Sequence, residues 1–287
     1  MTRWILGGCC LLASAAAGAL TVDTGLTNLQ VVQADANNVA VFSLTGTAGV
    51  AGTVQAQVSS ATAEVKPWAD LGPIGEGKWK GEIQGVPVGG PYKVSFRVLD
   101  AAGAPVEEAS VNDVLVGDLW VLAGQSNMQG WGNRNGTEET EDPLVHVYAM
   151  NDTWRMAKDP LHVLEESHDT VHANPPDEQT RQQQVTDALA RPKGTGLGMT
   201  FAKELARRTG RPIGLVACAH GGTSMDQWNP AARDQGGASL YGSMFRRVVA
   251  CGGHVKGVLW YQGESDANPE LCVVFKDKFT ALIAAMR

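Results

Sequence analysis

The chain has 287 residues, of which 44% are hydrophobic and 18% are charged, so it can bury a substantial core in one large domain or two smaller ones. Its formal net charge is −7, and Lys and Arg form no block anywhere in the chain. Nucleic acids and anionic membrane surfaces are bound by clustered cations. Neither is therefore expected as a partner.

Residues 1–19 have the features of a secretory signal peptide. Arg3 supplies the positive start, residues 5–20 are almost all apolar or small, and residues 17–19 offer a small-x-small cleavage site. The apolar run is shorter than the about 20 residues of a membrane span, and no second run of that length follows. We therefore expect a secreted or periplasmic protein with no membrane span, a lipid anchor at Cys9 being the minor alternative.

Three cysteines remain after removal of this segment: Cys218, Cys251 and Cys272. An odd number argues against a full disulfide framework and leaves room for one bridge at most. Their spacing matches no zinc pattern. Cys218 lies in an apolar, strand-like run, so we expect it to be a small core residue.

Residues 20–112 consist of short strands and turns. Residues 39–44, 52–58 and 92–98 alternate apolar and polar side chains, and Gly, Pro, Asn and Asp separate these runs. No pattern of helical length interrupts them. We therefore predict a small antiparallel β-sandwich that forms an accessory domain.

Residues 113–287 follow a different pattern, in which buried strands alternate with helices. The expected strands are 114–123, 144–150, 213–219 and 255–261, and the expected helices are 198–209, 240–250 and 269–286. This alternation predicts an α/β domain with three layers around a parallel sheet. The polar stretch from 131 to 195 is expected to be a loop over the sheet edge, apart from its one strand. His162, His168 and His172 in this stretch leave a metal site as a minor alternative.

Three motifs follow three of these strands at their carboxyl ends, where parallel sheets bind ligands. Residues 124–128 (GQSNM) place Ser126 on a turn, residues 221–228 (GGTSMDQW) offer backbone N–H groups, and residues 260–266 (WYQGESD) offer an amide and carboxylates. Each motif alone also fits a helix cap, a glycine turn or a strand-end cap. Their convergence on one edge favours a catalytic site.

The order of these motifs resembles the sialate O-acetylesterase type of the SGNH/GDSL hydrolase superfamily, over nearly all residues after about 113. The resemblance implies a flavodoxin-like parallel sheet preceded by a β domain, and no cofactor. It implies that Ser126 is the nucleophile and that the N–H groups of Ser126 and Gly222 and the side chain of Gln262 form the oxyanion hole. It further implies that Glu264 orients the base or contacts substrate. Substrate-binding residues are then expected at the flanking positions Gln125, Asn127, Asp226 and Trp228.

The chain departs from this family in one respect. Family members supply the general base from an Asp-x-x-His motif near the C-terminus, and none of the six histidines in this chain occupies that position. A serine without a base is a poor nucleophile at neutral pH. We therefore expect residues 113–287 to be an esterase domain that is incomplete at the C-terminus, and the isolated chain to have little activity.

The function predicted from the sequence is removal of O-acetyl groups from a carbohydrate through an acetyl-serine intermediate. Acetylated sialic acid, xylan and pectin-derived sugars all remain open as substrates, so an acetylxylan-type esterase is one alternative. Another is a carbohydrate-binding protein without catalysis. A metal-dependent hydrolase that uses the segment from His162 to His172 is the weakest alternative.

Overall fold

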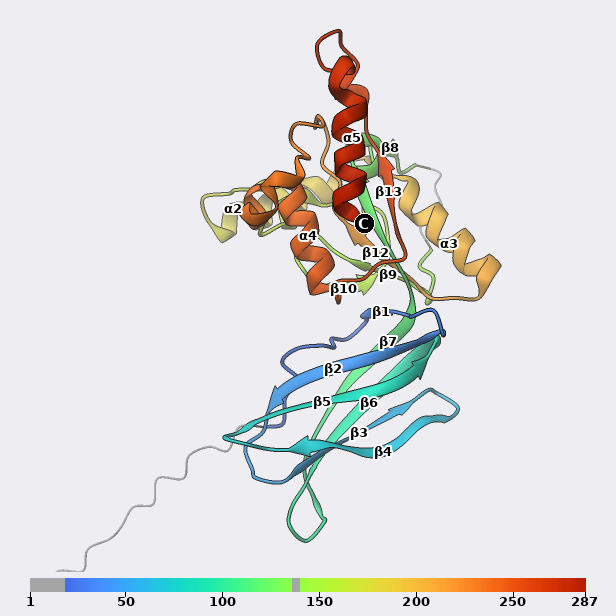
Figure 1. Cartoon of the computed structure of the whole chain (residues 1–287), viewed down its shortest axis with the longest axis vertical. Helices are drawn as coiled ribbons and strands as arrows, with labels where there is room; N and C mark the ends of the chain where they lie inside the picture. The colour runs from blue at the N-terminus through green and yellow to red at the C-terminus, as the bar shows by residue number, and fades with distance from the viewer. Residues whose placement is uncertain (1–18, 136–139) are drawn as a thin grey trace, which may run out of the picture.

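The computed structural model describes residues 19–135 and 140–287, so residues 1–18 of the predicted signal peptide lie outside the described residues. The chain forms a β-rich part followed by an α/β part, drawn at the bottom and top of Figure 1. One long strand, β7, passes through both parts. The motif loops all lie in the α/β part.

Two antiparallel sheets make up the β-rich part. Their strands are β2 (Val39–Thr47) with β5 (Lys78–Pro87), and β4 (Glu64–Pro73), β3 (Thr53–Ser59), β6 (Gly89–Leu99) and the first half of β7 (Pro105–Gly124) in that order. Every second residue of β2 is buried, as the alternating sequence predicts. Phe42 and Trp79 of the first sheet share one core with Phe96 of the second.

β7 changes its environment halfway along its 20 residues. Its first half pairs antiparallel with β6, and its second half pairs in parallel with β12 and β13. The side chains from Val114 to Leu119 are all buried, whereas those before Val111 are mostly exposed. The predicted domain boundary at 112/113 therefore falls inside a continuous strand. The change in composition seen in the sequence reflects burial on a second face and not a break in the strand.

The α/β part contains a sheet in the order β10, β9, β12, β7, β13. Its remaining strands are β9 (Val145–Tyr148), β10 (Trp154–Met156), β12 (Ile213–Ala217) and β13 (Gly257–Tyr261), and β1 (Val31–Gln33) also pairs with β7. All these pairings are parallel except that of β10 with β9. The predicted α/β fold is confirmed, and its sheet is mostly parallel, whereas the sequence predicted a parallel sheet.

Helices cover both faces of this sheet. On one face α3 (Leu197–Thr209) buries Met199, Ala202 and Ala206 against β9 and β12. On the other face lie α4 (Leu240–Ala250) and α5 (Cys272–Met286), with Leu240, Met244 and Leu282 in the core. The helices predicted at 198–209 and 240–250 are confirmed. The last helix begins at Cys272, three residues later than predicted.

The sequence prediction missed one helix, α2 (Glu178–Ala190), in the stretch expected to be a loop. Its sequence is mostly polar, and only Ala188 is buried, so no apolar stripe marks it. The Asp177 carboxylate caps its first turn by accepting a hydrogen bond from the Thr180 N–H. The short elements β8 (Gly132–Asn133), β11 (Lys193–Thr195), η1 (Leu164–Glu166) and η2 (Pro230–Ala238) were also not predicted.

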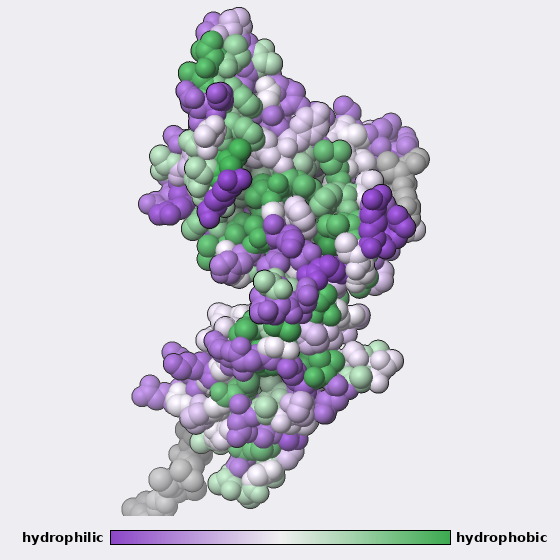
Figure 2. Space-filling view, turned by 45° about the vertical axis from the view of Figure 1, so that its right-hand side comes forward, coloured by the Kyte–Doolittle hydropathy of each residue, from purple (hydrophilic) through white to green (hydrophobic). Residues whose placement is uncertain are grey.

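Strand β13 is the least buried strand of the parallel sheet. Among the described residues it pairs with β7 alone, and none of its five residues is fully buried, whereas all five of β12 are. Tyr261 at its end and Val273 and Val274 of α5 are exposed. Figure 2 shows a broad hydrophobic area on the α/β part. None of the described helices has the length and apolar character needed to cross a membrane.

Candidate active site

The turn that carries Ser126 joins the end of β7 to α1 (Ser126–Gln129). Gly124 has a φ of +128°, and a β-carbon there would lie 2.1 Å from the carbonyl oxygen of Tyr261. The N–H of Gln125 donates to the same oxygen over 2.9 Å. Glycine is therefore required where β7 meets β13, and this contact fixes Ser126 at the carboxyl edge of the sheet.

The hydroxyl of Ser126 is not committed to any neighbour. Within the described residues its Oγ makes no hydrogen bond. The atom is not buried, so it is accessible to solvent. The residue is half-buried. A serine hydroxyl that is held in place but still open to solvent has the position that a nucleophile needs.

The glycine loop after β12 lies directly beside Ser126. A β-carbon on Gly221 would lie 3.6 Å from the Cα of Ser126, and the Gly221 N–H donates to Oε1 of Gln129 over 2.7 Å. Gly222 has a φ of +71° and open space around its Cα. In the part of the chain that the structure describes, its N–H has no acceptor. This amide is free for the oxyanion role predicted for it.

Gln262 does not fit the oxyanion role predicted from the sequence. Its side-chain amide donates to the carbonyl oxygen of Thr223 over 2.9 Å and to the carboxylate of Asp266, so both of its N–H groups are occupied. The buried Asp266 also accepts from the N–H of Met225 over 3.0 Å. Gln262 and Asp266 therefore hold the glycine loop against the loop after β13. The sequence prediction assigned no role to Asp266, although it closes the WYQGESD motif.

Glu264 and Asn127 meet at the edge of the site. Both are exposed, and Nδ2 of Asn127 donates to Oε1 of Glu264 over 2.6 Å. The structure therefore places the predicted acidic residue next to the turn that carries Ser126. The roles predicted for these two residues stay predictions.

Three residues predicted to bind substrate have other positions. Trp228 is fully buried, donates from Nε1 to Oγ1 of Thr223 over 3.0 Å and packs edge-on against Trp260. Gln125 is 3% exposed, which leaves almost no surface for a ligand. Asp226 is exposed, but it forms an ion pair of 2.6 Å with Lys278 of α5. Strand-end motifs do not show which side chains turn inward, so the sequence could not separate these cases.

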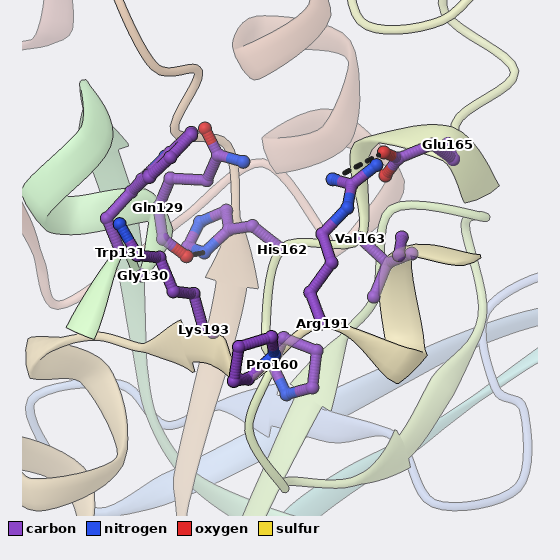
Figure 3. Close-up of a pocket in the computed structure, with 12 residues that line it drawn as sticks. Gln129, Gly130, Trp131, Pro160, His162, Val163, Glu165, Arg191 and Lys193 are labelled. Atoms are coloured by element: carbon purple, nitrogen blue, oxygen red, sulfur yellow. Dashed lines mark hydrogen bonds and ion pairs between the residues drawn. The ribbon is translucent and has the colours of Figure 1, made fainter. Parts of the chain in front are cut away.

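A cavity of about 240 Å³ is lined by Gln129 and Trp131, which both also lie next to Gly221 of the glycine loop. In Figure 3 Trp131 and Lys193 stand on one side of it, and the ion pair of Arg191 with Glu165, 3.0 Å long, stands on the other. Trp131 is 53% exposed, and the ammonium of Lys193 lies 5.0 Å from its ring centre. An exposed tryptophan beside a cavity suits stacking against a sugar ring.

A chain of hydrogen-bonded polar groups, of which Asp169 and Ser243 are buried and the two histidines half-buried, ends at His220, directly before the glycine pair. Nδ1 of His220 lies 3.0 Å from Nδ1 of His172, whose Nε2 lies 3.1 Å from Oγ of Ser243. The Ser243 hydroxyl donates to Oδ2 of Asp169 over 2.6 Å, and Arg246 donates to the same oxygen over 2.8 Å. The sequence prediction expected His220 to pack or cap, and it had no signal for the distant partners.

The histidines of the predicted loop do not converge on a metal. Nδ1 of His162 lies 3.1 Å from the carbonyl oxygen of Gln129, His172 contacts His220, and His168 is exposed. Across residues 19–135 and 140–287, no group of three or more His, Cys, Asp or Glu is placed to hold a metal ion. All three cysteines after the predicted signal peptide are free, and Cys218 is a core residue as expected.

Comparison with known proteins identifies the family. Residues 116–287 match the family model described as carbohydrate esterase, sialic acid-specific acetylesterase. The chain belongs to this family. A probable carbohydrate esterase of Arabidopsis thaliana is 34% identical over 159 residues, which are 52% of this chain and 54% of that protein. Human sialate O-acetylesterase is 26% identical over 221 residues, which are 66% of this chain and 39% of that protein.

A solved structure shares the fold. The crystal structure of a carbohydrate acetylesterase from Xanthomonas citri superposes with a TM-score of 0.56 and 24% identity, over 94% of this chain and 57% of that one. The chain thus spans between 39% and 54% of the length of the curated relatives that it matches. The family region contains all three motif loops, so the arrangement around Ser126 lies wholly within it.

Proposed function

We propose that this chain carries the reaction centre of a serine esterase that removes O-acetyl groups from carbohydrates. The observation that carries the proposal is the open hydroxyl of Ser126 beside the uncommitted N–H of Gly222, inside the family region. The names of the relatives, a probable carbohydrate esterase and sialate O-acetylesterases, support the same substrate class.

The proposed reaction has two steps. Oγ of Ser126 attacks the acetyl carbonyl carbon, and its proton passes to a base. The bond from that carbon to the sugar oxygen then breaks, and the sugar leaves as an alcohol after taking up the proton. Water next gives a proton to the base and attacks the carbonyl carbon of acetyl-Ser126. The bond from that carbon to Oγ breaks, Oγ takes up the proton, and acetate is released. The N–H groups of Ser126 and Gly222 would stabilise the negative oxygen in both steps, and no cofactor enters.

The finer features of the fold prediction belong to the same proposal. We propose that residues 113–287 are an SGNH-type, flavodoxin-like domain and that residues 20–112 are an accessory β-sandwich. A secreted or periplasmic location is proposed from residues 1–19 alone. Acetylated sialic acid, xylan and pectin-derived sugars remain the candidate substrates.

A carbohydrate-binding protein without catalysis is the second candidate, and one observation favours it. Among the described residues, no histidine nitrogen lies within hydrogen-bond distance of Oγ of Ser126. The cavity beside Trp131 would still bind a sugar without a base at Ser126.

The test is hydrolysis of p-nitrophenyl acetate and of acetylated sugars by this chain, beside a form extended through the downstream reading frame. Each form is compared with its Ser126→Ala variant and with Ser110→Ala, a matched serine exposed in the β-rich part. Hydrolysis that Ser126→Ala abolishes and Ser110→Ala leaves intact supports the esterase. Hydrolysis that survives Ser126→Ala rules out the proposed nucleophile. Folded proteins that hydrolyse none of these esters but bind a sugar saturably would establish the second candidate.

A further inference from the structure

The chain of polar groups that ends at His220 has a direction, and it begins at Asp169. Burial alone would raise the pKa of this carboxyl, but the hydrogen bonds from Arg246 and Ser243 outweigh burial and lower the pKa. Asp169 is therefore a carboxylate, which can only accept hydrogen bonds. The Ser243 hydroxyl has one proton, and it is donated to Asp169 over 2.6 Å.

This proton assignment fixes the state of His172. Because the proton of Ser243 is committed, its oxygen must accept from Nε2 of His172 across 3.1 Å. Burial lowers the pKa of His172 to about 3, so the ring is neutral and carries a single proton. With that proton on Nε2, Nδ1 of His172 holds a lone pair.

The same reasoning then fixes His220. Nδ1 of His220 must donate to the lone pair of His172 over 3.0 Å. Burial also lowers the pKa of His220, so this ring is neutral and its one proton lies on Nδ1. Nε2 of His220 is left without a proton. It is the free hydrogen-bond acceptor at the end of a chain of four residues.

Nε2 of His220 is accessible to solvent. Within the described residues this nitrogen makes no hydrogen bond. Nε2 of His162 also has no partner, but it is buried, whereas Nε2 of His220 is not. The N–H of His220 donates to the carbonyl oxygen of Gly124 over 3.0 Å, and the next residue, Gly221, contacts Ser126. The backbone of His220 is thus fixed between the nucleophile turn and the oxyanion loop.

We propose that His220 is a substrate-binding residue, whose unprotonated Nε2 accepts a hydrogen bond from a hydroxyl group of the acetylated carbohydrate. The residues Asp169, Ser243 and His172 position it by holding its proton on Nδ1. This inference rests on the proposed esterase function. A carbohydrate offers hydroxyl donors around its ester group, whereas p-nitrophenyl acetate offers none.

The kinetic test uses this difference between substrates. In the form of the protein that hydrolyses esters, His220→Ala and the control His254→Ala are assayed on p-nitrophenyl acetate and on 9-O-acetylated sialic acid and acetylated xylobiose. His254 is exposed, outside the site. We expect His220→Ala to lower kcat/KM about tenfold more on the acetylated sugar than on p-nitrophenyl acetate, and His254→Ala to change neither.

An equal loss on both substrates would overturn the inference, because it would assign His220 to catalysis or to structure. No loss on either would overturn it as well. Hydrolysis of p-nitrophenyl acetate without hydrolysis of any acetylated sugar would count against the proposed function and the inference together. Activity that survives Ser126→Ala would contradict the proposed function alone, and the tautomer measurement would still decide the state of His220.

The tautomer is measured by long-range ¹H–¹⁵N NMR on the 287-residue chain with labelled histidine. The expected spectrum shows His220 protonated on Nδ1 at pH 7, and Ser243→Ala shifts it toward a mixture with Nε2–H while the remaining amide spectrum is kept. A wild-type His220 protonated on Nε2 would overturn the inference directly, whatever the kinetic result.

Discussion

Asn127 and Glu264 are 137 positions apart in the chain and share a hydrogen bond of 2.6 Å between Nδ2 and Oε1. The bond joins the turn after β7 to the loop after β13. It therefore connects the residue next to the proposed nucleophile with Glu264 of the third motif. Removal of either partner tests whether this contact serves function or folding.

Glu264→Ala is expected to reduce esterase activity at least tenfold and to lower the free energy of unfolding by no more than about 1 kcal/mol, because the pair is exposed. The matched control is Glu270→Ala, an exposed glutamate near the same loop. Activity and urea denaturation are measured on both variants. A loss of stability that accounts for the loss of activity would assign Glu264 a structural role only.

Gly124→Ala is expected to lower the free energy of unfolding by at least about 3 kcal/mol, or to prevent folding. The new β-carbon would lie 2.1 Å from the carbonyl oxygen of Tyr261, and both atoms belong to strands that cannot move apart without breaking β7 from β13. Gly210→Ala is the control, because Gly210 also has a positive φ, of +67°, but has open space around it. This variant should lower the free energy of unfolding by about 1 kcal/mol. Equal stability of the two variants would contradict the close contact.

Arg247→Met is expected to destabilise the α/β part by about 3 to 5 kcal/mol. The Arg247 side chain is fully buried, and it donates to the carbonyl oxygens of Ala217 and Ala149 and to the carboxylate of Asp152. Methionine would leave the two carbonyl oxygens without this donor, whereas the Asp152 carboxylate would keep its ion pair with Arg246. Arg208→Met on the surface of α3 is the control, expected within about 0.5 kcal/mol of wild type in chemical denaturation.

Acidification is expected to destabilise the folded chain. Burial lowers the pKa of His162 to about 4. Burial is also the largest cause of the low pKa of His172, which is about 3. Between pH 6.5 and these values the unfolded state binds protons that the folded state does not, so stability falls as pH falls. Each histidine should lower the free energy of unfolding by about 2 kcal/mol when the pH falls from 7 to 5. Urea denaturation at both pH values should show that the free energy of unfolding falls less with pH for His162→Gln than for His254→Ala. An equal fall in the two variants would show that burial of His162 is not the cause.

Trp131→Ala is expected to weaken the binding of an acetylated sugar without a change in stability, because Trp131 is 53% exposed beside the cavity. Trp228→Ala should instead cost about 3 to 5 kcal/mol of stability, because Trp228 lies wholly in the core. Calorimetric titration with an acetylated xylo-oligosaccharide and thermal unfolding separate the two effects. Unchanged sugar binding by Trp131→Ala would exclude it from the site.

The sequence by itself determined the order and type of the main elements and the family, because periodicity and strand-end motifs are local properties. The strand that ends at Gly124 and the helices predicted at 198–209 and 240–250 follow from residues that are neighbours in the chain. The sequence prediction missed helix α2 because its mostly polar sequence has no apolar stripe.

Only the tertiary structure decided which way the side chains of each motif turn. It buried Trp228 and Gln125, committed the amide of Gln262 to Asp266, and left Gly222 free. It also brought His220 into contact with His172, 48 positions away in the chain. Such contacts depend on how loops cross over a sheet edge, and burial and hydrogen bonding between distant segments fix that path in ways that no local pattern records.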